Sequence, residues 1–352
     1  MTKINMELVV ASSIKNTAER VGCAESKKRI GYIDALRGFS MFCVVLMHFW
    51  NRFPMDIQHN IYFAKTEDVI FMFFLSLFFL ISGFFSIRSF AGKQIVDKII
   101  TYIISPLFFS LLLDVFVSGK IHSLSEFATY RYYWFTIALF QMQVMTLPIL
   151  LLRRYKLQSL VLLSLLLILC VPMTDRMPKS FISDILAWRK VCYYYPFYAL
   201  GVICVIYKEN FLRLLDNKWF RNGIVISFLS LLLMKGYFGG IPNMIISFLC
   251  QFAATLTIFL LFHSWQRFFR SANWFSRGMI LVGRRTLDIY FIHYFFLPST
   301  ACLATILRGD NIITMMLLVG TIITVVVMGI SMLIGQVIRL SPLLSRWLLG
   351  AK

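Results

Sequence analysis

The first long apolar run of the chain lies at residues 33–50, inside the stretch RIGYIDALRGFSMFCVVLMHFW (29–50). Its length is close to the ~20 residues that a helix needs to cross ~30 Å of hydrocarbon. No short apolar core followed by a small-residue cleavage site precedes it, so we expect no cleaved signal peptide. We therefore expect residues 33–50 to form a membrane-spanning helix that itself directs the chain to the membrane.

Similar runs recur along the rest of the chain. Of its 352 residues, 59% are hydrophobic and 14% are charged, whereas a soluble domain is nearer half apolar and a quarter charged. The candidate spans are 33–50, 69–87, 99–117, 132–152, 157–173, 191–207, 222–238, 243–263, 286–306 and 312–338. This composition excludes a cytosolic enzyme, a disordered chain and a nucleic-acid-binding module. It predicts an all-α fold, a polytopic transmembrane bundle of about ten helices.

The basic residues lie mainly between the apolar runs and give a net charge of +19. With a cytoplasmic N-terminus, 24 of the 35 Lys and Arg residues fall on the cytoplasmic side and 10 in outer loops. This asymmetry favours an N-in, C-in topology in the inner (plasma) membrane, where the expected partner is the lipid bilayer and not nucleic acid. We predict a cytoplasmic tail at 1–30, a membrane domain at 31–340 and a second tail at 341–352.

Three ionisable residues lie in the first predicted helix, where each is costly. His48 follows Arg37 by eleven residues. That spacing is about three helical turns, so both side chains project from one face, ~16 Å apart along the axis. Asp34 precedes Arg37 by three residues and can pair with it, but lies too far from His48 to touch it. A guanidinium binds phosphate or carboxylate, and a neutral imidazole can accept a proton from a hydroxyl group.

A simpler interpretation of these residues assigns them no chemistry. Arg37 can extend to the inner headgroups with Asp34 as its partner, and His48 can be a solvated anchor at the outer interface. Taken alone, Asp34 and Arg37 favour this interpretation, and His48 alone favours neither. The shared face of Arg37 and His48 favours a functional site.

Four separate stretches resemble motifs of the acyltransferase-3 family, integral membrane proteins that O-acylate cell-envelope glycans and lipids. The first is IDALRG, with an Arg and then a His after ten intervening residues, in the first helix. FFLISGFF (78–85) is similar to the second-helix motif, YWFTIALF (133–140) to that of a middle helix, and TLDIYFIHYFF (286–296) to a late motif. The four stretches follow the order of the family and extend from Ile33 to Phe296, so the set is fairly specific.

The resemblance implies acyl-CoA as a cytoplasmic donor, a catalytic His in the first helix, and an acceptor hydroxyl reached from within or across the membrane. Carried onto this chain, His48 is the general base, with Asp34 on the same helix. Arg37, Arg88 and Ser82 are the candidates for binding the anionic donor, although plain helix packing also explains Ser82.

The chain departs from the family at the entry to the third helix, where the family usually has an Arg-rich stretch. This sequence reads VDKIITYIISP and keeps Pro106, but isoleucines stand at the arginine positions. Either Lys93, Lys98 and Arg88 take over the phosphate contacts, or the donor is bound differently.

Further candidates lie in the middle and late motifs. Trp134, His293 and Tyr290 are possible substrate contacts, although a membrane-interface position for Trp134 and a hydrogen-bonded core position for His293 are the simpler explanations. Asp288 follows Arg284 and Arg285 by four and three residues, which predicts a local ion pair. No cysteine spacing indicates a metal site, and we expect none.

The sequence therefore predicts a membrane O-acyltransferase that moves an acyl group, most simply acetyl, from acyl-CoA to a hydroxyl of an envelope polysaccharide or lipid-linked sugar. The alternative is a transporter or flippase for lipid-linked sugars, because intramembrane Arg and His residues also mark translocation pathways. A third possibility is a non-catalytic partner in an envelope-synthesis complex. No inverted repeat is evident, which argues against a carrier.

Overall fold

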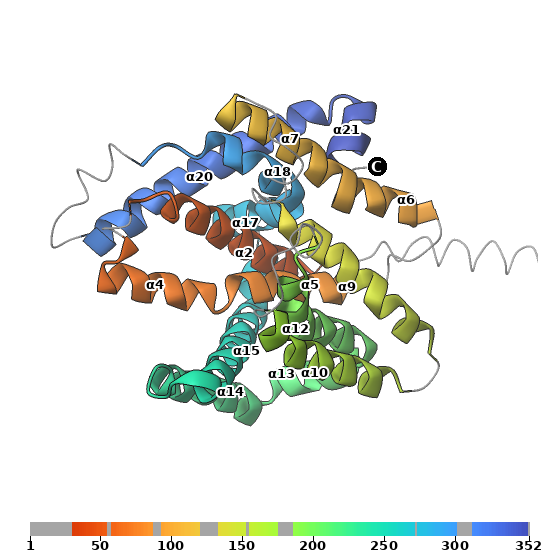
Figure 1. The fold of residues 1–352 in the computed structure, drawn as a ribbon, viewed down its shortest axis with the longest axis vertical. Helices are drawn as coiled ribbons and strands as arrows, with labels where there is room; N and C mark the ends of the chain where they lie inside the picture. Colours follow the sequence, from red (N-terminus) through yellow and green to blue (C-terminus); the bar gives the residue numbers. More distant parts are fainter. Residues whose placement is uncertain are drawn as a thin grey trace, which may run out of the picture.

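A computed structural model describes residues 30–54, 58–86, 93–119, 133–152, 155–174, 186–271, 273–300 and 312–350, and these residues contain helices and no strand. The helices are α2 (Gly31–Trp50), α4 (Ile61–Phe71), α5 (Phe74–Ser86), α6 (Lys93–Ile99), the π-helix η2 (Ile100–Ile104), α7 (Ser105–Ser118), α9 (Trp134–Leu151), α10 (Lys156–Thr174), α12 (Trp188–Ile206), α13 (Lys208–Asp216), α14 (Lys218–Met234), α15 (Gly240–Ser264), α16 (Gln266–Arg270), α17 (Trp274–Arg284), α18 (Thr286–Phe296), α20 (Ile312–Ile338) and α21 (Pro342–Leu349). The predicted all-α bundle is confirmed (Figure 1).

Local sequence explains where several helices begin and end. The side chain of Asn60 accepts hydrogen bonds from the first backbone N–H groups of α4, and Asn217 does the same for α14. Such N-caps satisfy donors that no helical carbonyl can reach. Pro106 directly follows the π-helix η2 within the continuous Val96–Phe116 helix, and Gly119 ends that helix in the left-handed conformation.

About ten membrane-crossing helices are predicted, and that number stays a prediction. In the described residues, five helices are long and apolar enough: Gly31–Trp50, Ile61–Ser86, Val96–Phe116, Gly240–Ser264 and Met316–Ile338. A sixth is possible if α12 and α13, which meet at 101°, form one broken span. Each predicted run does overlap a helix, but α18 has 11 residues. Its ~16 Å cannot cross the bilayer alone, because each residue adds only ~1.5 Å.

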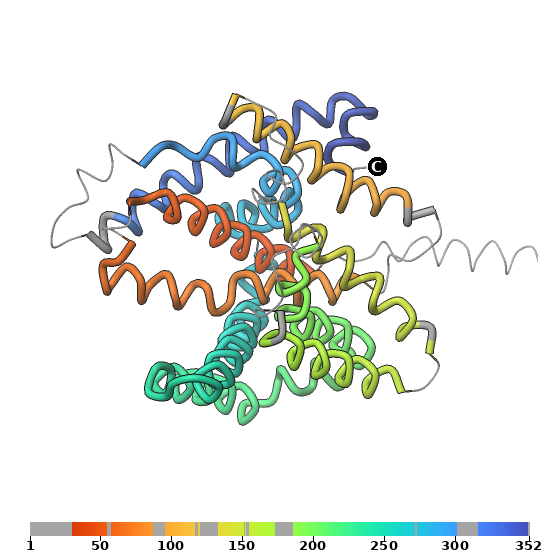
Figure 2. Tube along the Cα trace, in the orientation of Figure 1, coloured from red at the N-terminus to blue at the C-terminus, as the bar shows by residue number. Residues whose placement is uncertain are grey.

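Helix α2 lies at the centre of the bundle, where α5, α15, α17, α18 and α20 all contact it. Figure 1 shows α2 between α20 and α18 on one side and α4 on the other, and the tube in Figure 2 shows α20 running beside it. A 20-residue helix that is buried over most of its length fixes its side chains from every direction. The ionisable residues of α2 are therefore held inside the protein.

Glycines set the closest helix contacts. A Cβ atom at Gly201 of α12 would lie within 2.0 Å of the Leu80 carbonyl oxygen on α5, and Gly83 meets the Tyr198 backbone in the same way. Small residues let helices pack backbone to backbone in a membrane, where packing takes the place of the hydrophobic effect. Gly83 of the SGF motif in the second predicted span thus has a structural role, because it lets α5 pack closely against α12.

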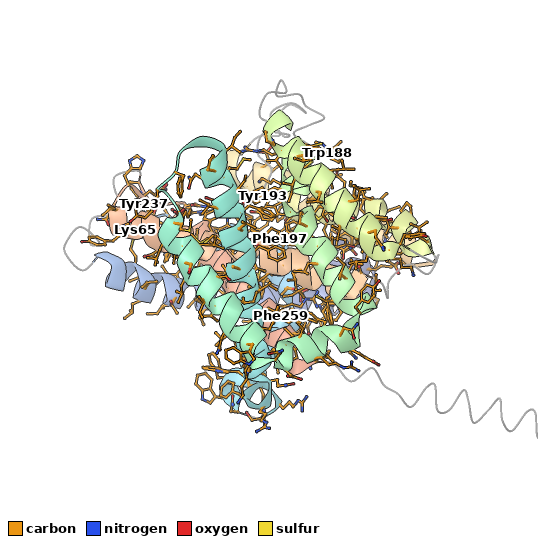
Figure 3. All side chains as sticks on the ribbon, turned by 90° about the horizontal axis from the view of Figure 1, so that it is seen from below. Lys65, Trp188, Tyr193, Phe197, Tyr237 and Phe259 are labelled. Carbon is orange, nitrogen blue, oxygen red and sulfur yellow. The ribbon has the colours of Figure 1, made fainter. Side chains whose placement is uncertain are left out.

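Helix α12 also packs against α15 through aromatic and polar contacts. The Tyr193 hydroxyl donates to the Gln251 side chain at 2.5 Å, and Phe197 packs against Phe248 and Phe252. Figure 3 shows Tyr193 and Phe197 on α12, beside α15 with Phe259. These contacts with α15 help to hold α12 in its position against α5.

Substituting Gly201→Ala should destabilise the protein by about 1–3 kcal/mol, because the added methyl group forces two backbones apart. The melting temperature of detergent-purified protein measures the effect. Gly223→Ala on α14 is the matched control, since a Cβ there meets nothing within 4 Å. An equal melting temperature for the two variants would contradict the proposed packing.

Candidate active site

One cavity of about 430 Å³ lies inside the bundle. Its wall is formed by α2, the α4–α5 span, α9 and α18, with single residues from α6, η2 and α12. Met41, Val44, Phe74, Leu75 and Phe78 make much of that wall apolar. A concave apolar cavity with a few polar groups is the usual form of a small-molecule site.

Arg37 and His48 both lie on the wall of this cavity, with Met41 and Val44 between them on the same face of α2. The helical spacing predicted this shared face, and their catalytic and binding roles remain predictions. The two residues are eleven positions apart, ~16 Å along the helix axis. The cavity therefore joins a fixed positive charge to an imidazole.

His48 is held by residues of α18. The Tyr294 hydroxyl lies 2.8 Å from Nε2 of His48, and the ring of His293 stacks on the His48 ring with centroids 5.3 Å apart. Arg52 fixes the end of α18 beside α2, because its guanidinium donates to the carbonyls of Leu297 (2.5 Å) and Tyr294 (3.3 Å). Two helices distant in sequence thus place the imidazole.

His293 and Tyr290, both predicted as substrate contacts, occupy different positions. Tyr290 lies on the cavity wall, whereas His293 is fully buried behind His48 and is not part of the wall. Nδ1 of His293 lies 2.9 Å from the Ile289 carbonyl, so this nitrogen carries the proton and donates. In this structure His293 contacts His48 and Tyr294, so a direct contact with substrate is not supported.

The Arg37 end of the cavity holds further polar groups. The guanidinium lies over the Phe85 ring, 5.0 Å from its centre, and Lys98, Ser82 and Ser86 line the same cavity. Lys98 is one of the lysines that the sequence offered in place of the missing third-helix arginines. Arg88, another of the predicted donor contacts, lies outside the described residues.

Trp134 lines the cavity as well. The Nζ atom of Lys190 lies over its ring, 3.8 Å from the centre, and the Tyr194 ring stacks near it at 6.3 Å. Lys190 and Asn51 are exposed and line the cavity, which indicates that it opens beside them. Asn51 follows His48 by three residues, so this opening leads to the imidazole.

Comparison with known proteins is consistent with this geometry. The acyltransferase-3 family, described as an acyltransferase domain, matches residues 30–336. The chain belongs to the acyltransferase-3 family. No curated protein and no solved structure matches significantly. Family membership and the long apolar helices together make this a multi-pass membrane acyltransferase.

Asp34, which the sequence predicts as a catalytic residue, lies outside the cavity. Its carboxylate is buried and lies 3.3 Å from Nε of Arg284 on α17, and it is not on the cavity wall. The predicted partner, Arg37, points into the cavity instead. A Cβ at Gly283 would lie within 2.0 Å of the Asp34 carbonyl, so α17 packs directly on this turn of α2. Asp34 therefore lies at the contact between α2 and α17, and its catalytic role stays a prediction.

Asp288 forms the local ion pair that the sequence predicted. It also forms a second ion pair, with an arginine distant in sequence, that the sequence did not predict. The fully buried carboxylate lies 3.4 Å from Arg285 and 2.6 Å from Arg339, the residue directly after α20. Arg339 follows the last apolar run and was counted only as a cytoplasmic charge. The pair joins α18 to α20 and so supports the helix that carries Tyr294.

Several cavity residues escaped sequence reasoning. Lys190, Asn51, Gln143 and Thr286 line the cavity, and Tyr294 holds His48. Tyr294 directly follows His293 in the late motif, which was the one available signal. Asn51 follows His48 by only three residues, whereas nothing in the sequence paired Lys190, Gln143 or Thr286 with His48, because they are far from it along the chain.

A double-mutant cycle separates a structural role of Asp34 from a catalytic one. Asp34→Asn and Arg284→Gln should each lower stability by about 1 kcal/mol, since half-exposed Arg284 keeps the pair partly solvated. The double variant should lose no more than either single variant, and acyl-transfer rates should stay within about threefold of wild type. Melting temperatures and initial rates measure the two effects. Abolished transfer in Asp34→Asn alone, with normal stability, would assign Asp34 to the catalytic machinery.

Proposed function

We propose that this protein transfers an acetyl group from acetyl-CoA to a hydroxyl of a cell-envelope polysaccharide or lipid-linked sugar, in the plasma membrane. The observation that carries the proposal is the single cavity shared by Arg37 and His48. A positive charge suits the phosphates of an acyl-CoA, and an imidazole suits proton removal from an acceptor hydroxyl.

The dimensions of the donor support this arrangement. About 13 bonds separate the thioester sulfur of acyl-CoA from its nearest phosphorus, roughly 16 Å when extended at ~1.2 Å per bond. Arg37 and His48 are separated by nearly the same distance along α2. A donor whose phosphates bind Arg37 and Lys98 therefore brings its thioester to His48, and the apolar walls cover the arm between them.

The chemistry that follows is direct transfer with His48 as general base. The acceptor oxygen attacks the thioester carbonyl while its proton passes to a ring nitrogen of His48. The C–S bond then breaks, and the leaving thiolate takes the proton back from His48. The products are an O-acetyl ester and CoA with a free thiol. Tyr294 and His293 act here by holding the imidazole in place.

The acceptor enters from the opposite end. Asn51 and Lys190 lie at the open part of the cavity near His48, and Trp134 offers an aromatic face on which a sugar ring can stack. With the N-terminus in the cytoplasm, this opening faces the outer side and Arg37 faces the cytoplasm. Donor and acceptor then meet at His48 from the two sides of the membrane.

His48→Ala should lower the rate of acetyl transfer by about 100- to 10,000-fold, the usual contribution of a general base. Labelled acetyl-CoA and purified protein, supplied with an extract of envelope glycans, provide the assay. His59→Ala is the matched control, since His59 is exposed and lies off the cavity wall. Full activity of His48→Ala would remove His48 as the base, and a wild-type protein that forms no labelled ester would favour a lipid-linked-sugar carrier.

Arg37→Ala should raise KM for acetyl-CoA by about 10- to 100-fold, because a charge-assisted hydrogen bond to phosphate contributes about 1.5–3 kcal/mol. The turnover number should change little, since the guanidinium lies a helix length from the reacting carbonyl. Arg267→Ala, an exposed arginine of α16, controls for loss of surface charge. An unchanged KM in Arg37→Ala would rule out donor binding at this residue.

A further inference from the structure

Gln143 is a buried polar side chain of the cavity wall that the proposed chemistry does not use. It lies on α9, is 4% exposed and lines the cavity. Its Oε1 atom has no hydrogen-bond partner among the described residues. A buried acceptor without a partner costs about 1–3 kcal/mol, so a native protein keeps one mainly where a ligand or water satisfies it.

The position of Gln143 on α9 places it between the two ends of the cavity. Phe135, Leu139 and Gln143 line the cavity from one face of the helix, and Gln143 is eight residues, ~12 Å, beyond Phe135. Tyr133, just before α9, packs against Tyr294 at 5.7 Å, so α9 begins at the His48 end. The helix also contacts η2, which follows Lys98.

An acyl-CoA donor contains polar groups that require a hydrogen-bond partner such as this side chain. Its pantetheine arm contains two secondary amides, and each presents an N–H donor and a carbonyl acceptor. Around the middle of the cavity, Met41, Val44, Leu75, Phe78 and Leu139 offer no partner for either group. An amide buried against such walls loses its hydrogen bonds to water without replacement.

We propose that Gln143 binds an amide of the pantetheine arm of acyl-CoA and so selects this class of donor; the inference rests on the proposed function. The Oε1 atom accepts a hydrogen bond from the amide N–H, and the adjacent NH₂ group can donate to the amide carbonyl. Arg37 then recognises the phosphates, Gln143 the arm, and His48 serves the thioester. An acyl donor without the arm leaves the glutamine unsatisfied and binds weakly.

Two donors and two variants test the assignment. Gln143→Met removes the amide and keeps the length of the side chain, and Arg37→Ala removes the phosphate contact. Each is assayed with acetyl-CoA and with acetyl-pantetheine, which has the arm but lacks the diphosphate and nucleoside. Gln143→Met should raise KM for both donors by roughly tenfold, because it removes a contact with the part they share. Arg37→Ala should raise KM for acetyl-CoA alone.

Gln141→Met is the control on the same helix. Gln141 lies two residues away and donates to the Leu186 carbonyl at 2.6 Å, outside the cavity. This variant should keep both KM values. Gln143→Asn, which withdraws the amide by one methylene, should show a rise between those of wild type and Gln143→Met and guards against a folding defect in the latter. Gel filtration in detergent checks that each variant remains dispersed.

The outcomes separate this inference from the proposed function. Normal acetyl transfer by wild type, with both KM values of Gln143→Met within twofold of it, would overturn the assignment of Gln143 alone. A rise in KM for acetyl-CoA but not for acetyl-pantetheine would also overturn it, since the contact would then be with the phosphate end. A wild-type protein that neither transfers acetyl from either donor nor binds CoA would overturn both proposals.

Discussion

The burial of α2 inside the bundle is the constraint on which the rest of the structure depends. A helix at the edge of the bundle would offer Arg37 to headgroups and His48 to the interface, where each would be solvated. Here neighbouring helices surround α2, and Gly38 and Gly283 let α17 approach it until backbones touch. The face of α2 that carries Arg37 and His48 therefore lines a cavity inside the protein. There a charge and a base can act on a ligand without competing water.

The same packing explains why the site needs helices from the whole length of the chain. Arg52 ties the end of α18 to the end of α2, and the buried Asp288 ties α18 to α20 through Arg339. These contacts set the position of Tyr294, which in turn sets that of His48. Polar groups are expensive in a membrane protein, and here several of them hold the helices on which the site stands.

The cavity combines polar ends with an apolar middle, and this division has a physical basis. Arg37 lies in the second turn of α2, and Lys98 lies near the start of the Val96–Phe116 helix. Apolar residues such as Met41, Val44 and Phe78 form much of the wall between the ends, because a buried polar group without a partner is costly. Gln143 is a polar residue of this wall, and its buried oxygen has no partner among the described residues.

Composition and periodicity determined the fold class, and the spacing of eleven residues determined that Arg37 and His48 share a face. The family followed from four ordered motifs and is confirmed by the match over residues 30–336. These properties are local, because helix geometry relates residues on one segment without reference to any other. The number of membrane-crossing helices stays a prediction, since apolar runs do not reveal where α18 stops or where α12 bends.

Only the tertiary structure determined which residues of the site contact one another. Asp34 was expected to pair with Arg37 three residues away, yet it pairs with Arg284, 250 residues along the chain. Lys190, Gln143 and Tyr294 likewise lie at the site only because the fold brings distant helices together. Which helix faces which depends on close packing of particular surfaces, such as glycine against backbone carbonyl, and that information is distributed over the whole chain.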